Sequence, residues 1–461
     1  MTGGSQVVIT FLGPTNYKPA CYYWPEAPAG CKGVTTDLFP LALRQWFPAA
    51  KFFVGLTKEA EGHDNWQKLR QEFGRCGRGE EGGGELEALP IPRGQSKEET
   101  WQIFEQMAKA AAGAEEVVID FTHALRSIPL VAVVTTLYVS ELGSDGGQPR
   151  VSHLLYGSYE TPIEPPPAEL DVPCGCRVVP VLDFIELARL ADWLKAAHLF
   201  TAAGDAREVA SLGKAWAADI RESAVAHPAG QVPAGTASAI EKLASTLHGF
   251  SLAIELGRPR DIRRRLKELT EAVETAAEAV EGVRGPLAQV LRALPRRYEK
   301  LAGDPEPASC LATLELDLKA IEWYVEAERL VQACSLAREW MTTWACCATG
   351  KNWENREERS DAEQLLRRPP TKGNETSGRV GETPAPEAAP VLSPVLPPEL
   401  TSQWRKLVGR VKQWRDEINH CGVGRCGLTD AQTIEQNVRQ LPEQLRKLLE
   451  ALKNDVIECG R

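Results

Sequence analysis

Two kinds of hydrophobic pattern alternate along the first 160 residues. Short unbroken apolar runs, rich in β-branched residues, are followed by longer segments in which apolar residues recur every three or four positions. Short apolar runs are typical of strands buried on both faces of a sheet, and the longer spacing is typical of amphipathic helices. Strands are predicted at 7–12, 52–56, 86–91, 117–121 and 151–156, and helices at 37–47, 64–73, 98–112 and 128–142. This alternation predicts an α/β domain over 1–160, with a mainly parallel sheet and helices on both faces.

The pattern changes after residue 160. Six prolines between 161 and 180 predict an extended linker over 161–181. From 182 to 461 nearly every apolar segment has helical spacing, so a second, all-α domain is predicted there. A tract at 369–398 is rich in Pro, Gly, Thr and Glu and is predicted to be a disordered insertion that carries no chemistry. The run Arg263-Arg264-Arg265 is interpreted as a charged, solvated helix face.

Length and composition narrow the classes of function. A chain of 461 residues is too long for one ordinary core, which fits two domains. We expect a cytoplasmic protein without a membrane span, because there is no apolar run of ~18 residues and the N-terminus lacks the basic region of a signal peptide. The net charge of −10 argues against nucleic-acid binding over the whole surface and leaves room for a local basic cleft.

The 12 cysteines do not predict a metal centre. Cytosolic cysteines stay reduced, so a disulfide framework is not expected. The two spacings that come closest to a metal site are Cys174/Cys176 and Cys421/Cys426, and neither is a C-x-x-C pair. No metal ligands are therefore assigned.

Polar residues cluster where one strand ends and the next helix begins. The apolar run at 117–119 leads to Asp120, and four polar residues follow it within a short span: Thr122, His123, Arg126 and Ser127. The carboxyl edge of an open α/β sheet is where ligands bind, since helix N-terminal N–H groups there favour anions. The arginine adds a bidentate phosphate donor. The alternative is that the hydroxyls only cap the helix while His123 and Arg126 face solvent.

The segment 120–130, DFTHALRSIPL, resembles the D-x-T-H-x-x-R-S-x-P motif of the CRISPR-associated CARF–HEPN proteins, the ancillary ribonucleases of type III CRISPR systems. That family usually has glycine where Ala124 stands here. Residues 7–17 resemble the family's first strand and loop, and residues 156–160 resemble its late strand. The resemblance covers 1–160 and is weaker beyond. No G-x-G-x-x-G stretch follows the first strand, which disfavours a nicotinamide cofactor.

The resemblance implies that residues 1–160 form a Rossmann-like CARF sensor that dimerises and binds a cyclic oligoadenylate across its two-fold axis. An even-numbered ring suits an isologous dimer, so cyclic tetra-adenylate is expected first and cyclic hexa-adenylate second. The expected ligand-binding residues are Gly13, Thr15, Asn16, Tyr17, Thr122, His123, Arg126 and Ser127.

The second motif lies near the C-terminus, where Arg415 and His420 match the R-x(4–6)-H pattern of HEPN ribonucleases. A histidine can transfer either proton in RNA cleavage, and an arginine can stabilise the charged phosphorane. The expected catalytic residues are Arg415, Asn419 and His420. Positions five apart on a helix differ by ~140°, so His420 must lie at or beyond a helix end. The family assembles one composite cleft from two protomers, and the alternative is a solvated helix end without catalytic function.

A second match to the same pattern, Arg221 with His227, is discounted because a proline follows the histidine. The function expected from both motifs is a metal-independent endoribonuclease of antiviral defence, activated allosterically by a cyclic oligoadenylate. It would cleave single-stranded RNA and leave 2′,3′-cyclic phosphates without any cofactor. Two alternatives stay open. One is a CARF regulator that lacks nuclease activity, and the other is a sensor that degrades its own ligand, with His123 or a nearby hydroxyl as the catalytic group.

Overall fold

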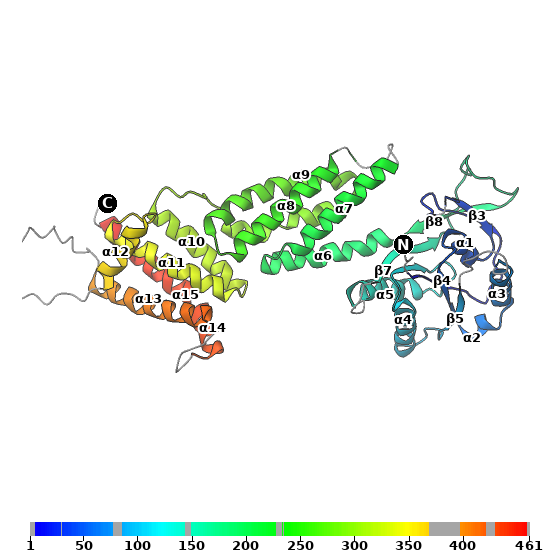
Figure 1. The fold of residues 1–461 in the computed structure, drawn as a ribbon, viewed down its shortest axis with the longest axis horizontal. Helices are drawn as coiled ribbons and strands as arrows, with labels where there is room; N and C mark the ends of the chain where they lie inside the picture. The colour runs from blue at the N-terminus through cyan, green and yellow to red at the C-terminus, as the bar shows by residue number, and fades with distance from the viewer. Residues whose placement is uncertain are drawn as a thin grey trace, which may run out of the picture. The chain divides into compact units, whose positions relative to one another are not determined.

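The computed structural model describes residues 5–28, 30–76, 85–142, 149–226, 233, 235–367, 397–420 and 429–458. The chain divides into two compact units, Met1–Asp192 and Trp193–Arg461. The first unit contains a mixed sheet and the second is helical (Figure 1). The expected insertion at 369–398 lies almost wholly outside the described residues, as do His227 and Cys421. No helix among the described residues is long and apolar enough to cross a membrane.

The first unit is built on an eight-stranded sheet in the order β3-β2-β8-β7-β6-β1-β4-β5. Most neighbouring strands are parallel, and only β2–β3 and β7–β8 are antiparallel among the described pairs. The strands are β1 (Gln6–Phe11), β2 (Ala20–Tyr23), β3 (Gly33–Thr36), β4 (Lys51–Leu56), β5 (Leu86–Pro90), β6 (Glu116–Asp120), β7 (Arg150–Gly157) and β8 (Arg177–Asp183). The helices are α1 (Phe39–Trp46), α2 (Lys58–Glu61), α3 (Asp64–Cys76), α4 (Lys97–Ala111) and α5 (Ile128–Leu142).

Helices cover both faces of this sheet, as the hydrophobic pattern predicted. Side chains alternate along a strand, so β1 sends Val8 to one face and Val7 and Ile9 to the other. Val8 belongs to the core formed with α1 and α3, whereas Ile9 belongs to the core formed with α4 and α5. The central strands are mostly apolar because both of their faces are buried.

The stretch expected to be a linker differs in the structure, because its end forms strand β8. The strand pairs in parallel with β2 and antiparallel with β7, and it buries Val178, Val179 and Val181. Five of the six prolines between 161 and 180 precede it. Pro180 lies within the strand, where its lack of an N–H is tolerated and its carbonyl accepts a hydrogen bond from Ser158 N–H at 2.9 Å. The sheet unit therefore extends beyond the expected boundary at 160.

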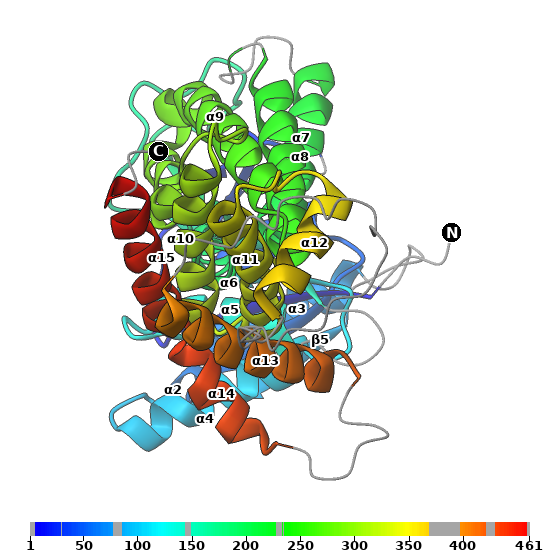
Figure 2. The same cartoon turned by 90° about the vertical axis from the view of Figure 1, so that its left-hand side faces the viewer.

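The second unit is a helical assembly around one apolar core. Figures 1 and 2 show α7, α8 and α9 side by side, and α11 packs against α10 and α13. Its elements are α7 (Arg207–Ala226), α8 (Thr236–Glu255), α9 (Pro259–Ala293), the 3₁₀ helix η1 (Arg296–Leu301), α10 (Cys310–Glu326), α11 (Leu330–Thr349), α12 (Arg356–Arg367), α13 (Pro398–Asn419), α14 (Ala431–Arg439) and α15 (Leu441–Glu458). Helix α6 (Ile185–Ala203) runs through the division between the units.

Helical spacing continues across two breaks between helices. The segment 311–343 forms α10 and α11, with Glu328 between them at a φ of 57°. The segment 430–455 forms α14 and α15, and Pro442 stands at the second position of α15. Proline is favoured in a first turn, where its missing N–H has no partner to lose. Helical spacing alone did not reveal these breaks.

Candidate functional site at the carboxyl edge of the sheet

A pocket of about 420 Å³ lies in the sheet unit beside the ends of β6 and β7. The polar residues after β6 and the loop after β1 both reach it, because the carboxyl ends of parallel strands meet at one edge of a sheet. Its lining consists of Asn16, Tyr17, Lys18, Tyr22, Thr122, His123, Tyr156, Gly157, Tyr159, Glu160 and Arg177. Four of the eight residues expected to bind a ligand are in this lining: Asn16, Tyr17, Thr122 and His123.

Asp120 connects chain segments that meet at this edge of the sheet. Its side chain is fully buried and accepts hydrogen bonds from the Thr10 hydroxyl at 2.6 Å, and from the Thr122 hydroxyl and N–H at 2.6 and 2.8 Å. Burial raises the pKa of Asp120 to about 6, although these donors act in the opposite direction. Asp120 therefore ties β1 to the turn that follows β6.

The hydroxyl of Thr122 makes its hydrogen bonds to neighbouring parts of the chain. Its hydroxyl donates to Asp120 and accepts a hydrogen bond from Gly157 N–H at 2.8 Å. A side chain at position 157 has no room, since a Cβ there would come within 3.1 Å of the Thr122 methyl group. The hydroxyl's only proton is thus used within the protein. Thr122 fixes the end of β7 against the turn after β6 and contributes its remaining surface to the pocket.

His123 is held as a neutral imidazole. Its ring stacks on Tyr17 with a centroid separation of 3.8 Å, and its Nε2 accepts a hydrogen bond from Phe39 N–H, the first residue of α1, at 3.2 Å. Burial lowers the pKa of His123 to about 4. With Nε2 acting as an acceptor, the ring proton is on Nδ1. Near neutral pH His123 is therefore suited to donating a hydrogen bond rather than to carrying positive charge.

The loop after β1 is held in place by close packing. Gly13 N–H donates to the Tyr17 hydroxyl at 3.0 Å, and a Cβ at Gly13 would lie only 2.8 Å from that oxygen. Asn65, in the first turn of α3, donates through Nδ2 to the carbonyls of Gly13 and Thr15 at 3.2 and 2.8 Å. Gly13 and Thr15 thus shape the loop from outside the pocket lining. The role of Asn65 was not expected, since nothing in its local sequence marks it.

Arg126 and Ser127 lie outside the pocket lining. The chain turns between Thr122 and the start of α5 at Ile128, which places Arg126 on the surface. The Ser127 hydroxyl instead lies near Gly94, on the loop between β5 and α4. The residues of the motif are thus divided between the pocket and the surface beside it.

Several lining residues were not anticipated from the sequence. Arg177 comes from the stretch expected to be a linker, and its guanidinium lies 5.1 Å from the ring centroid of Tyr159. The Tyr156 hydroxyl donates to Glu160 at 2.9 Å. Tyr156, Tyr159 and Glu160 lie in the segment that resembles the family's late strand, which was the available signal for them. Arg177 had none, because only the pairing of β8 brings it to this edge.

The lining combines aromatic surface with cations. Tyr17, Tyr156 and Tyr159 are partly exposed and offer aromatic surface to bases, while Lys18 and Arg177 can neutralise phosphate charge. Among the described residues there is no group of three or more metal-ligating side chains. The arrangement suits a ligand that has both flat rings and negative charge.

Arg415, Asn419 and His420 lie at the end of α13. The helix ends at Asn419, and the His420 N–H donates to the carbonyl of Asp416 at 3.0 Å. His420 and Asn419 are exposed. The Arg415 guanidinium contacts the neighbouring Asp416 at 2.6 Å, and no hydrogen bond or ion pair joins it to His420 in the described chain. The spacing predicted this helix end, and the residues that follow it, 421–428, lie outside the described residues.

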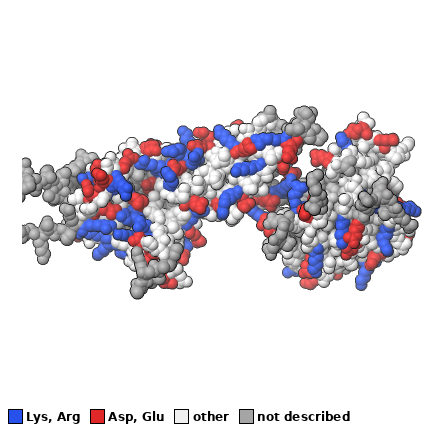
Figure 3. All heavy atoms as spheres, viewed as in Figure 1, with Lys and Arg blue, Asp and Glu red and all other residues white. Residues whose placement is uncertain are grey.

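The exposed face of α13 is strongly basic. Between Glu399 and Asp416 the helix contains no acidic residue, and five arginines and lysines occur over that length: Arg405, Lys406, Arg410, Lys412 and Arg415. Lys406, Arg410 and Lys412 are exposed, while Trp404, Leu407 and Val411 face the core. Figure 3 shows Lys and Arg side chains gathered over α13, and Figure 2 looks onto this helix from the side. Several exposed cations along one helix of an acidic protein are a candidate for binding phosphodiesters.

The structure also fixes the end of α13 against the start of α14. Glu417 is buried and accepts hydrogen bonds from Gln413 Nε2 at 2.8 Å and from Thr429 N–H at 3.3 Å. Asp430 caps α14 by accepting from the N–H groups of Gln432 and Thr433. Asp416, Glu417 and Asp430 therefore hold the backbone around the expected catalytic pair.

Comparison with known proteins adds one match. Residues 189–305 match the family model described as CRISPR-associated protein MJ1674, second domain. This supports a CRISPR-associated protein. The matched region covers α7, α8, α9 and most of α6, so it includes neither the pocket of the sheet unit nor the end of α13. No curated protein matches the chain.

Proposed function

We propose that this protein is a cyclic-oligoadenylate sensor of CARF type joined to a metal-independent HEPN endoribonuclease. The observation that carries the proposal is the pocket at the carboxyl edge of the sheet, where Tyr17, Thr122 and His123 of the two family-like segments come together. The CRISPR association of residues 189–305 supports the same biological setting. The activator is cyclic tetra-adenylate, with cyclic hexa-adenylate as the second candidate.

The chemistry of the pocket supports an oligoadenylate ligand. Tyrosine rings stack on bases of any kind, and the guanidinium of Arg177 and ammonium of Lys18 complement phosphates. The neutral His123 can donate through Nδ1 to a phosphate or ribose oxygen. Because its pKa lies near 4, His123 is a poor general acid at neutral pH. This favours ligand sensing over ligand degradation by His123.

An exposed apolar face on α5 supports a homodimer of the sheet unit. Leu130, Val134 and Tyr138 occur four residues apart and are 75%, 54% and 42% exposed. Soluble monomers seldom leave such a row uncovered. A second copy of the same chain would bury it in an isologous contact. Replacing Val134 with Glu should convert the dimer to a monomer in multi-angle light scattering.

The basic face of α13 supports RNA as the substrate of the helical unit. The exposed cations precede Arg415 and His420 on the same helix. Arg415 and His420 are not hydrogen-bonded or ion-paired to each other within the described chain. A cleft assembled from two copies would supply both groups to one phosphodiester. Activation would follow if ligand binding favours the dimer arrangement in which that cleft is closed.

The test is RNA cleavage measured with a fluorogenic single-stranded RNA in the presence of a metal chelator. Wild-type protein should cleave only when cyclic tetra-adenylate or cyclic hexa-adenylate is added. The variant His420→Ala should bind the activator normally and lose cleavage. His248→Ala serves as the matched control, because His248 is an exposed histidine in the middle of α8. Cleavage by His420→Ala at the wild-type rate, or no response to either ring, would refute the proposal.

A further inference from the structure

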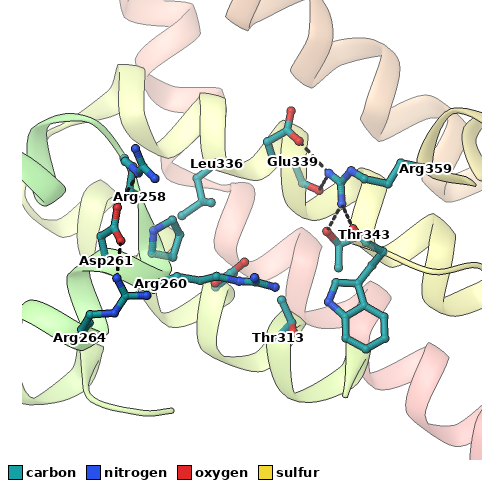
Figure 4. Close-up of a pocket in the computed structure, with 13 residues that line it drawn as sticks. Arg258, Arg260, Asp261, Arg264, Thr313, Leu336, Glu339, Thr343 and Arg359 are labelled. Atoms are coloured by element: carbon teal, nitrogen blue, oxygen red, sulfur yellow. Dashed lines mark hydrogen bonds and ion pairs between the residues drawn. The ribbon is translucent and has the colours of Figure 1, made fainter. Parts of the chain in front are cut away.

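A second pocket, of about 540 Å³, lies inside the helical unit. Its walls come from the start of α9, from α10 and α11, and from the segment leading into α12. Figure 4 shows Arg258, Asp261 and Arg264 on one side, and Glu339, Thr343 and Arg359 on the other. The lining consists of Gly257, Arg258, Pro259, Arg260, Asp261, Arg264, Thr313, Asp317, Leu336, Glu339, Thr343, Trp353 and Arg359. Neither motif found in the sequence accounts for this pocket.

Four arginines line the pocket, and their carboxylate partners orient them without using all their donors. Arg258 contacts the carboxylate of Asp261 through Nε at 2.6 Å. Arg264 contacts Asp261 and Glu306 only at 3.5 and 3.4 Å. A guanidinium has five N–H groups, and these two partly exposed arginines therefore keep donors available to a ligand.

The other two arginines are held more firmly. Arg359 donates to the Thr343 hydroxyl at 3.0 Å and contacts Glu339 at 2.7 Å. Arg260 contacts Glu354 at 2.6 Å, and in Figure 4 its side chain extends towards Thr313. These two side chains are fixed in position before any ligand arrives. A site with pre-oriented cations loses less side-chain entropy on binding.

The arginine run at 263–265 lies beside this pocket. Its three side chains have different surroundings, so the interpretation of the whole run as a solvated face was wrong. Arg263 is only 4% exposed and pairs with Asp317 at 3.0 Å, while its Nε and Nη2 have no hydrogen-bond partner. Asp317 is one of the pocket's acidic residues, and this pairing neutralises it. Arg264 lines the pocket, and Arg265 pairs with Glu268 on the same helix at 2.7 Å. The three arginines thus have three different environments.

The pocket lining also contains Trp353, whose indole Nε1 is buried and therefore not open to a ligand in the pocket. The arginines call for a ligand rich in hydrogen-bond acceptors. Leu336, Pro259 and the indole ring add apolar surface that a bare phosphate would not use.

We propose that this pocket binds a nucleoside phosphate, either free or as the terminal nucleotide of an RNA strand. The guanidiniums of Arg258 and Arg264 contact the phosphate, helped by the N–H groups in the first turn of α9. The indole and the neighbouring apolar side chains contact the base or sugar. The volume fits one nucleotide, since small-molecule sites usually measure about 300–1,000 Å³. This site is separate from the pocket of the sheet unit and does not depend on the function proposed for it.

The test is a binding titration by calorimetry on the full chain. The probes are AMP, ATP, inorganic phosphate, and a short RNA with either a 5′-phosphate or a 5′-hydroxyl. The double variant Arg258→Gln/Arg264→Gln should weaken nucleotide binding roughly tenfold or more, because two charge-assisted contacts are lost. Both side chains are more than half exposed, so the fold should not change. Arg265→Gln is the matched control on the same helix and should bind like the wild type.

Three further outcomes decide the proposal. Tight binding of AMP or ATP identifies a free nucleotide, whereas a preference for 5′-phosphorylated over 5′-hydroxyl RNA identifies a strand end. Affinity should fall as salt rises, since the contacts are ionic. The proposal fails if no probe binds at millimolar concentration, or if the double variant and Arg265→Gln bind equally well. Cyclic tetra-adenylate binding is measured alongside, and its retention in the double variant shows that any loss is confined to this pocket.

Discussion

The pocket of the sheet unit gathers residues from distant parts of one chain, whereas the motif residues at the end of α13 are close in sequence and are not joined to each other. In the sheet unit, Thr10 and Asp120 are joined at 2.6 Å although 110 residues separate them, and Gly157 bonds to Thr122 across 35 residues. On α13, Arg415 and His420 are five residues apart and share no bond. A parallel sheet brings strand ends together, whereas five helical positions turn two side chains ~140° apart. The proposed nuclease site therefore needs groups from outside α13.

The largest expected effect separates catalysis from RNA binding along α13. Arg415→Ala should lower kcat for activated RNA cleavage roughly 10²–10³-fold, because a donor to the phosphorane is lost. Arg410→Ala is the matched change one and a half turns earlier, on the exposed basic face. It should raise KM and leave kcat within a few-fold. If Arg415→Ala, like Arg410→Ala, changes KM and leaves kcat within a few-fold, Arg415 belongs to the basic face and not to a catalytic cleft.

The next largest effect tests whether His123, in the sheet pocket, is uncharged near neutral pH. The pKa of His123 is lowered from 6.5 to about 4 in the folded protein, so the unfolded chain binds the proton more tightly. Above pH 6.5 this histidine does not lower the free energy of unfolding. As pH falls from 6.5 towards 4, the free energy of unfolding decreases by up to about 3 kcal/mol, because the unfolded chain takes up the proton first. The free energy of unfolding of the wild type should therefore fall relative to His123→Gln over that range. Urea denaturation at several pH values measures the difference.

Asp120 has the opposite dependence, since its folded pKa of about 6 lies above its ordinary value of 3.8. Its contribution is greatest below pH 3.8 and is lost as pH rises through 6. Both proteins in the His123 comparison contain Asp120, so its contribution cancels in their difference. A difference that does not change with pH would show that His123 is not held as a neutral acceptor for Phe39.

A somewhat smaller loss is expected when the hydroxyl that joins β6 and β7 is removed. Thr122→Val deprives buried Asp120 of one donor and Gly157 N–H of its acceptor, which should cost about 2–3 kcal/mol of unfolding free energy. Thr15→Val, in the exposed loop after β1, should change stability by less than about 0.5 kcal/mol. Equal losses in the two variants would contradict the structural role given to Thr122.

The smallest expected effect compares the two arginines near the sheet pocket. Arg177→Gln should weaken activator binding roughly tenfold, since Arg177 lines the pocket. Arg126→Gln should have a smaller effect, because Arg126 lies on the surface outside the lining. Isothermal titration with cyclic tetra-adenylate measures both. A larger loss for Arg126→Gln would mean that dimerisation carries that side chain to the ligand.

The local sequence predicted those features that depend on residues adjacent in the chain. The strand ending at Asp120, the turn holding Thr122 and His123, and the helix end before His420 all follow from short patterns. Strand β8 was missed because a proline-rich stretch favours extended chain of any kind, and only pairing with β2 and β7 makes it a strand. The arginines of the helical pocket were missed for a similar reason, since charge runs on helices are usually solvated.

The sequence by itself determined the division into a sheet part and a helical part, because hydrophobic periodicity follows from the geometry of each element. It also determined which polar residues lie at the end of β6. Only the tertiary structure decided that Arg177 reaches the sheet pocket, that Arg126 stays outside it, and that Arg263 is buried against Asp317. Those positions depend on which distant segments pack together, and burial and pairing with distant residues are not encoded in any short stretch of chain.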